Sequence, residues 1–343
     1  MLAYSIFYLS QLGFILIARM LGVRNNKQLL LFLISLATCF AGFRGNIGTD
    51  VIAYRSFYDG IGAKDGEVAF EPLFLMIAML GNTIDLPSQF LIISVAVLQG
   101  IFIYQILKRI EERDFFYLIF IATFFVYLQM NIIRVGLALC IVTYALVLNE
   151  ERNKSAVPVY VIGILTHVTA MFALPLFSKR WWQVIPIVIA IIIIFQEFFL
   201  KKLMAYFISE DIVGNSSEFV GIGFLLSLAI IAYCITAENK WGERAIRISF
   251  FAFALFKIAI ALFSAFDRIS LVFGMPIFLL LLRTKVKAQT RLALLVLVAY
   301  NTYGSLSFIA NSDAAMEALI AKNPGFTLLY EDTKWLPYEF FWK

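Results

Sequence analysis

Long apolar runs separated by short charged connections recur along the whole chain. Runs of roughly 20 apolar residues are what a helix needs to cross a lipid bilayer. They predict ten membrane-spanning helices, over residues 2–20, 29–43, 89–107, 115–130, 132–148, 183–200, 219–237, 246–265, 268–283 and 292–310. The predicted fold class is therefore all-α, a polytopic membrane helix bundle.

Two further apolar stretches fit a membrane crossing less well. Residues 72–84 form a short run, and residues 157–177 carry His167 at their middle and Pro175 near their end. The positive-inside rule places most of the 28 Lys and Arg residues in connections on the cytoplasmic side. Those connections are residues 19–28, 108–113, 152–154, 179–180, 240–247 and 283–291.

This topology requires residues 71–107 to cross the membrane once and residues 157–177 not to cross it at all. Each of these stretches is therefore predicted to contain a broken or re-entrant element on the outer side. Broken helices at membrane depth are tolerated where their free backbone groups line an enclosed or watery cavity. The same topology predicts that both ends of the chain face outwards.

Composition excludes several classes of protein. The chain is 62% hydrophobic and 15% charged, with a mean hydropathy of +0.88, whereas soluble domains average about 25% charged residues. A soluble enzyme, a nucleic-acid binder and a secreted disulfide scaffold are therefore excluded, and the net charge of +5 reflects membrane topology. Cys39, Cys140 and Cys234 lack the spacing of a metal site or a disulfide framework.

No Pro-rich, Ser-rich or repetitive linker divides the chain. We expect a single transmembrane domain over residues 1–310, with an outer-face loop at residues 44–71, followed by a C-terminal interfacial tail at residues 311–343. Residues 2–21 lack the basic region and cleavage site of a signal peptide, which predicts a retained span. The aromatic residues of the tail are compatible with an interfacial helix, a lid or a disordered end.

The polar connection that starts at Arg44 is the first candidate for chemistry. Gly45 and Gly48 permit backbone conformations in which amide groups converge on an anion, and Arg44 supplies a planar fork for phosphate. Asp50 is a candidate to remove a proton from a sugar hydroxyl. The alternative is a solvated loop in which Asp50 caps a helix beginning near Val51 and Arg44 anchors at the lipid headgroups.

Two more polar residues interrupt apolar sequence. Arg134 lies in a very tight connection between two spans, where an arginine is costly unless it meets an anion, a carboxylate or the interface. It is either a site residue or a side chain that reaches the headgroups. His167, the only histidine, is either a hydrogen-bonded structural group or a catalyst at the tip of the re-entrant element. One histidine without spaced partners does not make a zinc site.

Charges in the last third of the chain complete the set. Lys257, near the middle of its predicted span, needs a partner or a polar cavity. Asp267 and Arg268 either neutralise one another or contribute to a site. The candidates on or towards the outer face are Arg44, Asp50, Arg134, His167, Lys257 and Arg268. Several cations that converge from distant segments suit a diphosphate, and a diphosphate held in a membrane implies a polyprenyl carrier.

Five short motifs occur in an order that resembles the EpsG-like proteins, the Wzy-type polymerases of O-antigens, capsules and exopolysaccharides. The stretch from Phe43 to Asp50, with Tyr54 and Phe57, is similar to the family's R…GTD..Y…F signature. The other four motifs lie at residues 70–73, 131–134, 165–170 and 267–270. Two positions depart from the pattern. Val135 stands where the family usually has Gln and lacks its polar group, whereas Thr169 stands where it usually has Ser and keeps a hydroxyl.

The resemblance implies a fold similar to the GT-C-type lipid-linked glycosyltransferases, in a bacterial inner membrane, with the active site facing the periplasm or the cell exterior. It implies a polymerase that moves the growing glycan from undecaprenyl diphosphate onto a lipid-linked repeat unit, without a cofactor or a metal. The expected partners are undecaprenyl-diphosphate-linked oligosaccharides, membrane lipid, a chain-length regulator and a flippase, and no nucleic acid.

In this interpretation Arg44, Arg134 and Arg268 bind the diphosphate and stabilise its departure. Asp50, or failing it His167, acts as the general base on the acceptor hydroxyl. The remaining expected substrate-binding residues are Gly48, Thr49, Tyr54 and Lys257.

Two other functions compete with this interpretation. A transporter or flippase for a lipid-linked or acidic saccharide would also use broken helices and buried basic residues, with its site near the membrane midplane, where Lys257 would fit. An acyltransferase with His167 as its base is less favoured, because no Asp or Glu lies near that histidine in the sequence.

Overall fold

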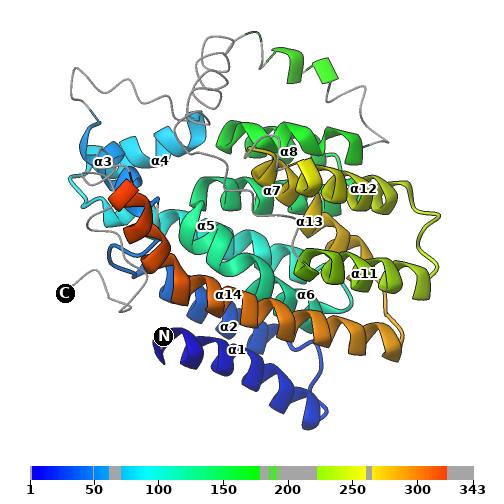
Figure 1. The fold of residues 1–343 in the computed structure, drawn as a ribbon. Coiled ribbons are helices and arrows are strands. Elements are labelled where there is room, and N and C mark those ends of the chain that lie inside the picture. Colours follow the sequence, from blue (N-terminus) through cyan, green and yellow to red (C-terminus); the bar gives the residue numbers. More distant parts are fainter. Residues whose placement is uncertain are drawn as a thin grey trace. The chain divides into compact units, whose positions relative to one another are not determined.

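The computed structural model describes residues 2–48, 50–61, 71–177, 185–186, 188–190, 193, 222–259 and 265–322. The regular secondary structure of these residues is entirely helical (Figure 1). Among them, five helices are long and apolar enough to cross a membrane, and five shorter ones are also apolar. The expected all-α membrane bundle is confirmed at this level, and the chain is a multi-pass membrane protein. The count of ten spans and the GT-C-like fold stay predictions.

The helix bounds follow the predicted spans closely. The long apolar helices are α1 (Leu2–Met20), α5 (Gln89–Leu107), the continuous pair α6 (Arg113–Ile119) and η1 (Phe120–Asn131), α7 (Ile133–Glu150) and α14 (Ala288–Lys322). The others are α2 (Lys27–Gly42), α3 (Val51–Asp59), α4 (Pro72–Thr83), α8 (Ala156–Thr166), η2 (Val168–Leu176), α11 (Ile222–Ala237), α12 (Arg244–Ile258) and α13 (Ala265–Leu282). The predicted span 183–200 and the tail beyond residue 322 lie almost wholly or wholly outside the described residues.

Contacts divide the chain into two compact units. The first comprises residues 1–108, 113–137 and 295–343, and the second comprises residues 109–112 and 138–294. In the first unit α2 packs along α5, and in the second α12 packs along α13 (Figure 1). The single-domain boundary at residue 310 stays a prediction, although α14 continues through it as one helix to Lys322.

One long segment of the first unit is wound as a π-helix. The segment Phe120–Asn131 is apolar over nearly its whole length, and the Ile132 N–H bonds five residues back to the Tyr127 carbonyl at 2.9 Å. A helix that is hydrophobic all round is typical of a buried element. The Ser305 hydroxyl of α14 donates to the Ala122 carbonyl at 2.9 Å. Side chains of other helices therefore supply hydrogen-bond donors to this wider, less regular backbone.

The predicted break in residues 157–177 is confirmed. Helix α8 ends at Thr166, His167 is extended with φ −160° and ψ 132°, and a 3-10 helix follows. The buried Tyr160 hydroxyl donates to the carbonyls of Ala170 at 3.1 Å and Met171 at 2.9 Å. These bonds join α8 to the 3-10 helix that follows the break. Whether this element re-enters the outer side of a membrane stays a prediction.

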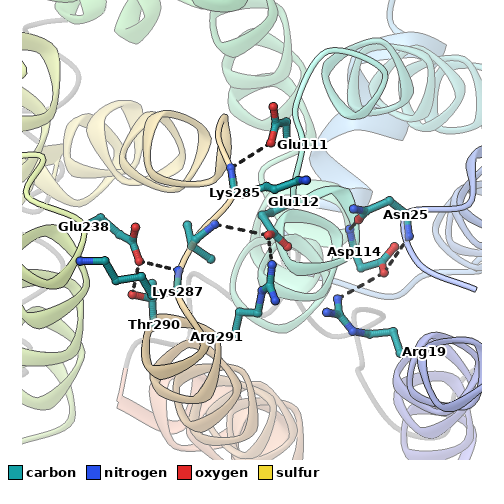
Figure 2. Close-up of polar contacts among 11 residues, drawn as sticks. Arg19, Asn25, Glu111, Glu112, Asp114, Glu238, Lys285, Lys287, Thr290 and Arg291 are labelled. Atoms are coloured by element: carbon teal, nitrogen blue, oxygen red, sulfur yellow. Dashed lines mark hydrogen bonds and ion pairs between the residues drawn. The ribbon is translucent and has the colours of Figure 1, made fainter. Parts of the chain in front are cut away.

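Carboxylates hold the charged connection between α13 and α14 in the second unit (Figure 2). Glu112 accepts hydrogen bonds from the Arg291 guanidinium at 2.5 Å and from the Val286 N–H at 3.3 Å. Glu111 accepts from the Lys285 N–H at 3.0 Å. These backbone bonds fix the path of the connection, because each acid receives an amide that has no helical partner.

The first unit contains a similar arrangement at its own charged connection. Asp114, at the start of α6, accepts from the Arg19 guanidinium at 3.3 Å and from the Asn25 N–H at 3.0 Å (Figure 2). The sequence predicted only on which side of the membrane these connections lie. The structure adds that their acids bind backbone amides as well as arginines.

Candidate functional site

The Arg44 side chain binds backbone carbonyls of its own loop and of the neighbouring helices. Its side chain is fully buried, and its Nε donates to the Ile47 carbonyl at 3.1 Å. Its Nη1 donates to the Ala41 carbonyl in the last turn of α2 and, at 3.3 Å, to the Gln129 carbonyl of η1. Carbonyls at helix ends lack a partner in their own helix and need another donor when buried. Arg44 therefore joins α2, the loop and η1, and the alternative that places it at lipid headgroups is wrong.

Two buried glutamines of α5 satisfy the backbone at the same breaks. The Gln89 amide donates to the carbonyls of Gly42 at 2.5 Å and Arg44 at 3.1 Å. The Gln99 amide donates to the Ile133 carbonyl at 2.9 Å, at the start of α7. Neither residue is among the candidates predicted from the sequence. Gln99 carries a signal, since it is an isolated Gln within an apolar run, whereas Gln89 stands at the start of its run, directly after Pro87 and Ser88.

Gly48 is required by the backbone. Its φ is +98°, a left-handed conformation that strains other residues, and an added Cβ would lie 2.6 Å from the Met130 carbonyl oxygen. The loop therefore lies directly against the end of η1. Its expected role in substrate binding stays a prediction, and Thr49 lies outside the described residues.

Asp50 occupies the N-cap position of α3 without capping it. The helix begins at Val51, as the sequence predicted, but the Asp50 carboxylate makes no bond to the backbone of the first turn. Instead, its Oδ2 accepts from the Tyr54 hydroxyl at 3.3 Å. The carboxylate is half-exposed, whereas Tyr54 is buried. The alternative in which the Asp50 side chain caps α3 is thus wrong, and the Tyr54 hydroxyl orients the Asp50 carboxylate.

Arg134 forms an ion pair with Glu71. Its Nη1 lies 2.9 Å from the Glu71 carboxylate, which is almost fully buried at the start of α4. Its guanidinium carbon lies 5.5 Å from the centre of the Tyr54 ring and 5.6 Å from that of Phe74, distances at which a cation and an aromatic face attract. The side chain stays 17% exposed. The prediction that Arg134 needs an anion, a carboxylate or the interface is therefore met by a carboxylate. Glu71 belongs to the motif at residues 70–73 but was not among the site candidates predicted from the sequence.

These residues form one group, which we call the Arg134 cluster: Asp50, Tyr54, Glu71, Phe74 and Arg134. The Tyr54 side chain connects its two halves, because its hydroxyl meets Asp50 while its ring meets the guanidinium. The cluster brings together residues at the starts of α3, α4 and α7. Two of them, Glu71 and Arg134, are 63 positions apart in the sequence. A half-exposed carboxylate beside a held guanidinium is an arrangement that suits proton removal next to a developing anion.

His167, in the second unit, is the N-cap residue of η2. It is fully buried, its Nδ1 lies 2.9 Å from the Thr169 hydroxyl, and it accepts from the Thr169 N–H at 3.3 Å. An Nδ1 that accepts a backbone N–H assigns the ring proton to Nε2 in the neutral form. The lone pair that a general base would use is therefore engaged in capping η2. The hydroxyl of Thr169, which the departure from the family pattern retains, is the group that meets it.

Lys257 and Arg268 also belong to the second unit. Lys257 lies in the last turn of α12, one residue before its end at Ile258, and is half-buried. The predicted span 246–265 continues into residues 260–264, which lie outside the described residues, so the place of Lys257 at mid-span stays a prediction. An ammonium near helical C-terminal carbonyls is electrostatically favourable. Arg268 lies in the first turn of α13 and is half-buried. The convergence of either cation with the Arg134 cluster stays a prediction. Among the described residues, no group of three His, Cys, Asp or Glu side chains is arranged to hold a metal ion.

The chain matches the model of the EpsG family over residues 27–322. It belongs to the EpsG family. The match covers all five motifs, and the family is one of polysaccharide polymerase-like proteins. The resemblance to the EpsG-like proteins is thereby confirmed, and EpsG membership indicates a polymerase-like function. Neither the curated proteins nor the solved structures include a significant match to the chain.

Proposed function

We propose that this EpsG protein is a polysaccharide polymerase that transfers a growing glycan from undecaprenyl diphosphate to a lipid-linked repeat unit. The observation that carries the proposal is the Arg134 cluster, in which a half-exposed acid and an ion-paired guanidinium meet around Tyr54. The cluster draws on three of the motifs that the chain shares with its family. We place it on the periplasmic or outer side of a bacterial inner membrane.

In the proposed reaction, the acceptor hydroxyl oxygen bonds to the anomeric carbon of the donor glycan. The bond between that carbon and the diphosphate oxygen breaks, and undecaprenyl diphosphate leaves with the electron pair. The Asp50 carboxylate takes the hydroxyl proton, and the Tyr54 hydroxyl holds that carboxylate in position. Arg134 stabilises the negative charge that builds on the leaving oxygen. Positioning of two bulky lipid-linked substrates supplies a further share of the rate.

Glu71 is a positioning residue in this scheme. A buried carboxylate at 2.9 Å fixes one edge of the Arg134 guanidinium, while two aromatic rings restrict its planes. A preorganised cation costs no reorganisation when charge develops on the substrate. The same pair leaves Arg134 neutralised before substrate binds, so a second cation is needed for a dianionic leaving group. That Arg268 and Lys257 bind the diphosphate stays a prediction from the sequence.

Arg44 and His167 take supporting roles in this proposal. The Arg44 guanidinium satisfies three backbone carbonyls and thereby shapes the loop that leads to Asp50. His167 caps η2 through the lone pair that catalysis would require. Asp50 is consequently the proposed base.

The proposal is tested by reconstituting the purified chain in liposomes with the lipid-linked repeat units of its source cells. Longer glycans on the carrier are expected, and Asp50→Asn is expected to lower the elongation rate by at least about a hundredfold. Asp85→Asn is the matched control, because Asp85 is exposed in the turn before α5 and its φ of +54° suits Asn. Redistribution of the lipid across leaflets without lengthening would contradict the proposal.

A further inference from the structure

Arg55 of α3 is a partly buried cation that forms no salt bridge with any carboxylate of the described residues. Its Nη2 donates to the Gln89 amide oxygen at 2.5 Å. Its Nε is buried and has no hydrogen-bond partner among the described residues. Asp59, one turn further along α3, is exposed and attracts Arg55 electrostatically, without a salt bridge to it among the described residues. A neutral amide is therefore the strongest partner that the described residues give to this guanidinium.

Such a placement is unfavourable for a protein without ligand. Removing a cation from water costs free energy that a neutral acceptor repays only in part. Burial accordingly lowers the pKa of Arg55, and the Asp59 carboxylate opposes that shift only partly. A charged group kept in this position suggests that an anion from outside the chain completes its surroundings.

The neighbouring arginines have stronger or more numerous partners than Arg55. Arg134 is paired with the Glu71 carboxylate, and Arg44 donates to three backbone carbonyls. Arg55 is oriented by Gln89, whose amide nitrogen is fixed on the carbonyls of Gly42 and Arg44. The guanidinium is thus held in place by the same glutamine that stabilises the loop.

We propose that Arg55 binds a phosphoryl oxygen of the lipid-linked substrate. That this oxygen belongs to the carrier diphosphate rests on the proposed polymerase function, whereas anion binding at Arg55 does not. A guanidinium with free N–H groups matches the geometry of phosphate oxygens and would supply the second cation that a diphosphate needs beside Arg134.

The test measures binding of inorganic pyrophosphate to the purified full-length chain by titration calorimetry. Arg55→Met is expected to weaken this binding by at least about tenfold, since one charge-assisted hydrogen bond is lost. Arg24→Met is the matched control, because Arg24 is exposed in the connection after α1, and it should bind as the parent chain does. Asp59→Asn should bind pyrophosphate as tightly or more tightly, because it removes a nearby negative charge. Equal affinity in the Arg55 variant, or no binding by the parent chain, would overturn the proposal.

A second readout separates binding from a structural role. If Arg55 is kept for an anion, Arg55→Met should unfold at the same or a higher temperature in the absence of pyrophosphate and should lose the stabilisation that pyrophosphate gives the parent chain. A lower unfolding temperature without the anion would instead assign Arg55 to the fold and contradict the proposal. Nanodiscs with and without phosphatidylglycerol identify the source, because a headgroup ligand would compete with pyrophosphate and a carrier diphosphate site would not. Elongation assays test the polymerase independently of these results.

Discussion

Two arginines at neighbouring breaks in the first unit have opposite surroundings. Arg44, in the loop after α2, is fully buried and donates to the carbonyls of Ala41, Ile47 and Gln129. Arg134, in the turn before α7, faces a carboxylate and two aromatic rings and keeps part of its side chain exposed. In the sequence both arginines look alike, because each is a cation next to an apolar span.

The difference lies in what each break between helices requires from its arginine. A buried loop between helices leaves carbonyls without donors, and one guanidinium can serve several of them because its N–H groups spread in a plane. A site for an anion needs a guanidinium that is held by other groups and still open on one side. Arg44 meets the first demand, and in the proposed function Arg134 meets the second.

Replacement of Arg44 by Ala should produce the largest effect. It removes three bonds to buried carbonyls and leaves those carbonyls without donors, so a loss of about 3–5 kcal/mol in unfolding free energy is expected. Thermal unfolding of the purified variant, against Arg24→Ala as an exposed control, measures it. A variant that unfolds like the parent chain but fails to elongate glycans would contradict the structural role of Arg44. Arg44 would then be a candidate for a role in the reaction.

Replacement of the Arg134 pair should affect activity rather than folding. Removal of Arg134 alone would strand the buried Glu71 carboxylate, so the informative variant is Arg134→Met with Glu71→Gln. We expect elongation to fall by about 10²–10³, the usual effect of losing one group that stabilises transition-state charge. The unfolding temperature should change little, because both charges leave together. Retention of full activity would remove Arg134 from the proposed mechanism.

Replacement of Gly48 should have a smaller effect and tests how closely the loop that contains Arg44 packs against η1. Gly48→Ala should destabilise the chain by about 2 kcal/mol, because it adds a Cβ 2.6 Å from the Met130 carbonyl at a φ of +98°. Gly22→Ala is the matched control, because Gly22 has a φ of +77° with nothing within 4 Å of its added Cβ. The difference between the two unfolding temperatures isolates the close approach to η1. Equal losses would mean that the contact with Met130 contributes nothing.

Much of the fold follows from the sequence because hydropathy is a local property. The span predicted over residues 89–107 is α5 (Gln89–Leu107), and the prediction of a broken element within residues 157–177 is borne out at His167. The start of α3 at Val51 was also predictable, since a polar connection ends there.

The remaining features depend on contacts between distant residues. The π-helical winding of Phe120–Asn131 is accompanied by side-chain donors from other helices, and no local pattern in that apolar run distinguishes it from an α-helix. The ion pair of Arg134 with Glu71 joins residues 63 positions apart. Sequence reasoning named Arg134 as a candidate, but its partner and its difference from Arg44 required the fold.

His167 extends the comparison to the second unit, with the smallest expected effect. If His167 resembles Arg44 and only completes the backbone, His167→Asn should retain elongation within about twofold, because an Asn side-chain oxygen can accept the Thr169 N–H as an N-cap. If it resembles Arg134 and takes part in the reaction, the same variant should lose elongation by at least about a hundredfold, since an amide does not accept a proton near neutral pH. His167→Leu separates folding from chemistry, because it removes the cap and should lower the unfolding temperature. An inactive but stably folded Asn variant would make the histidine, and not Asp50, the better candidate for the base.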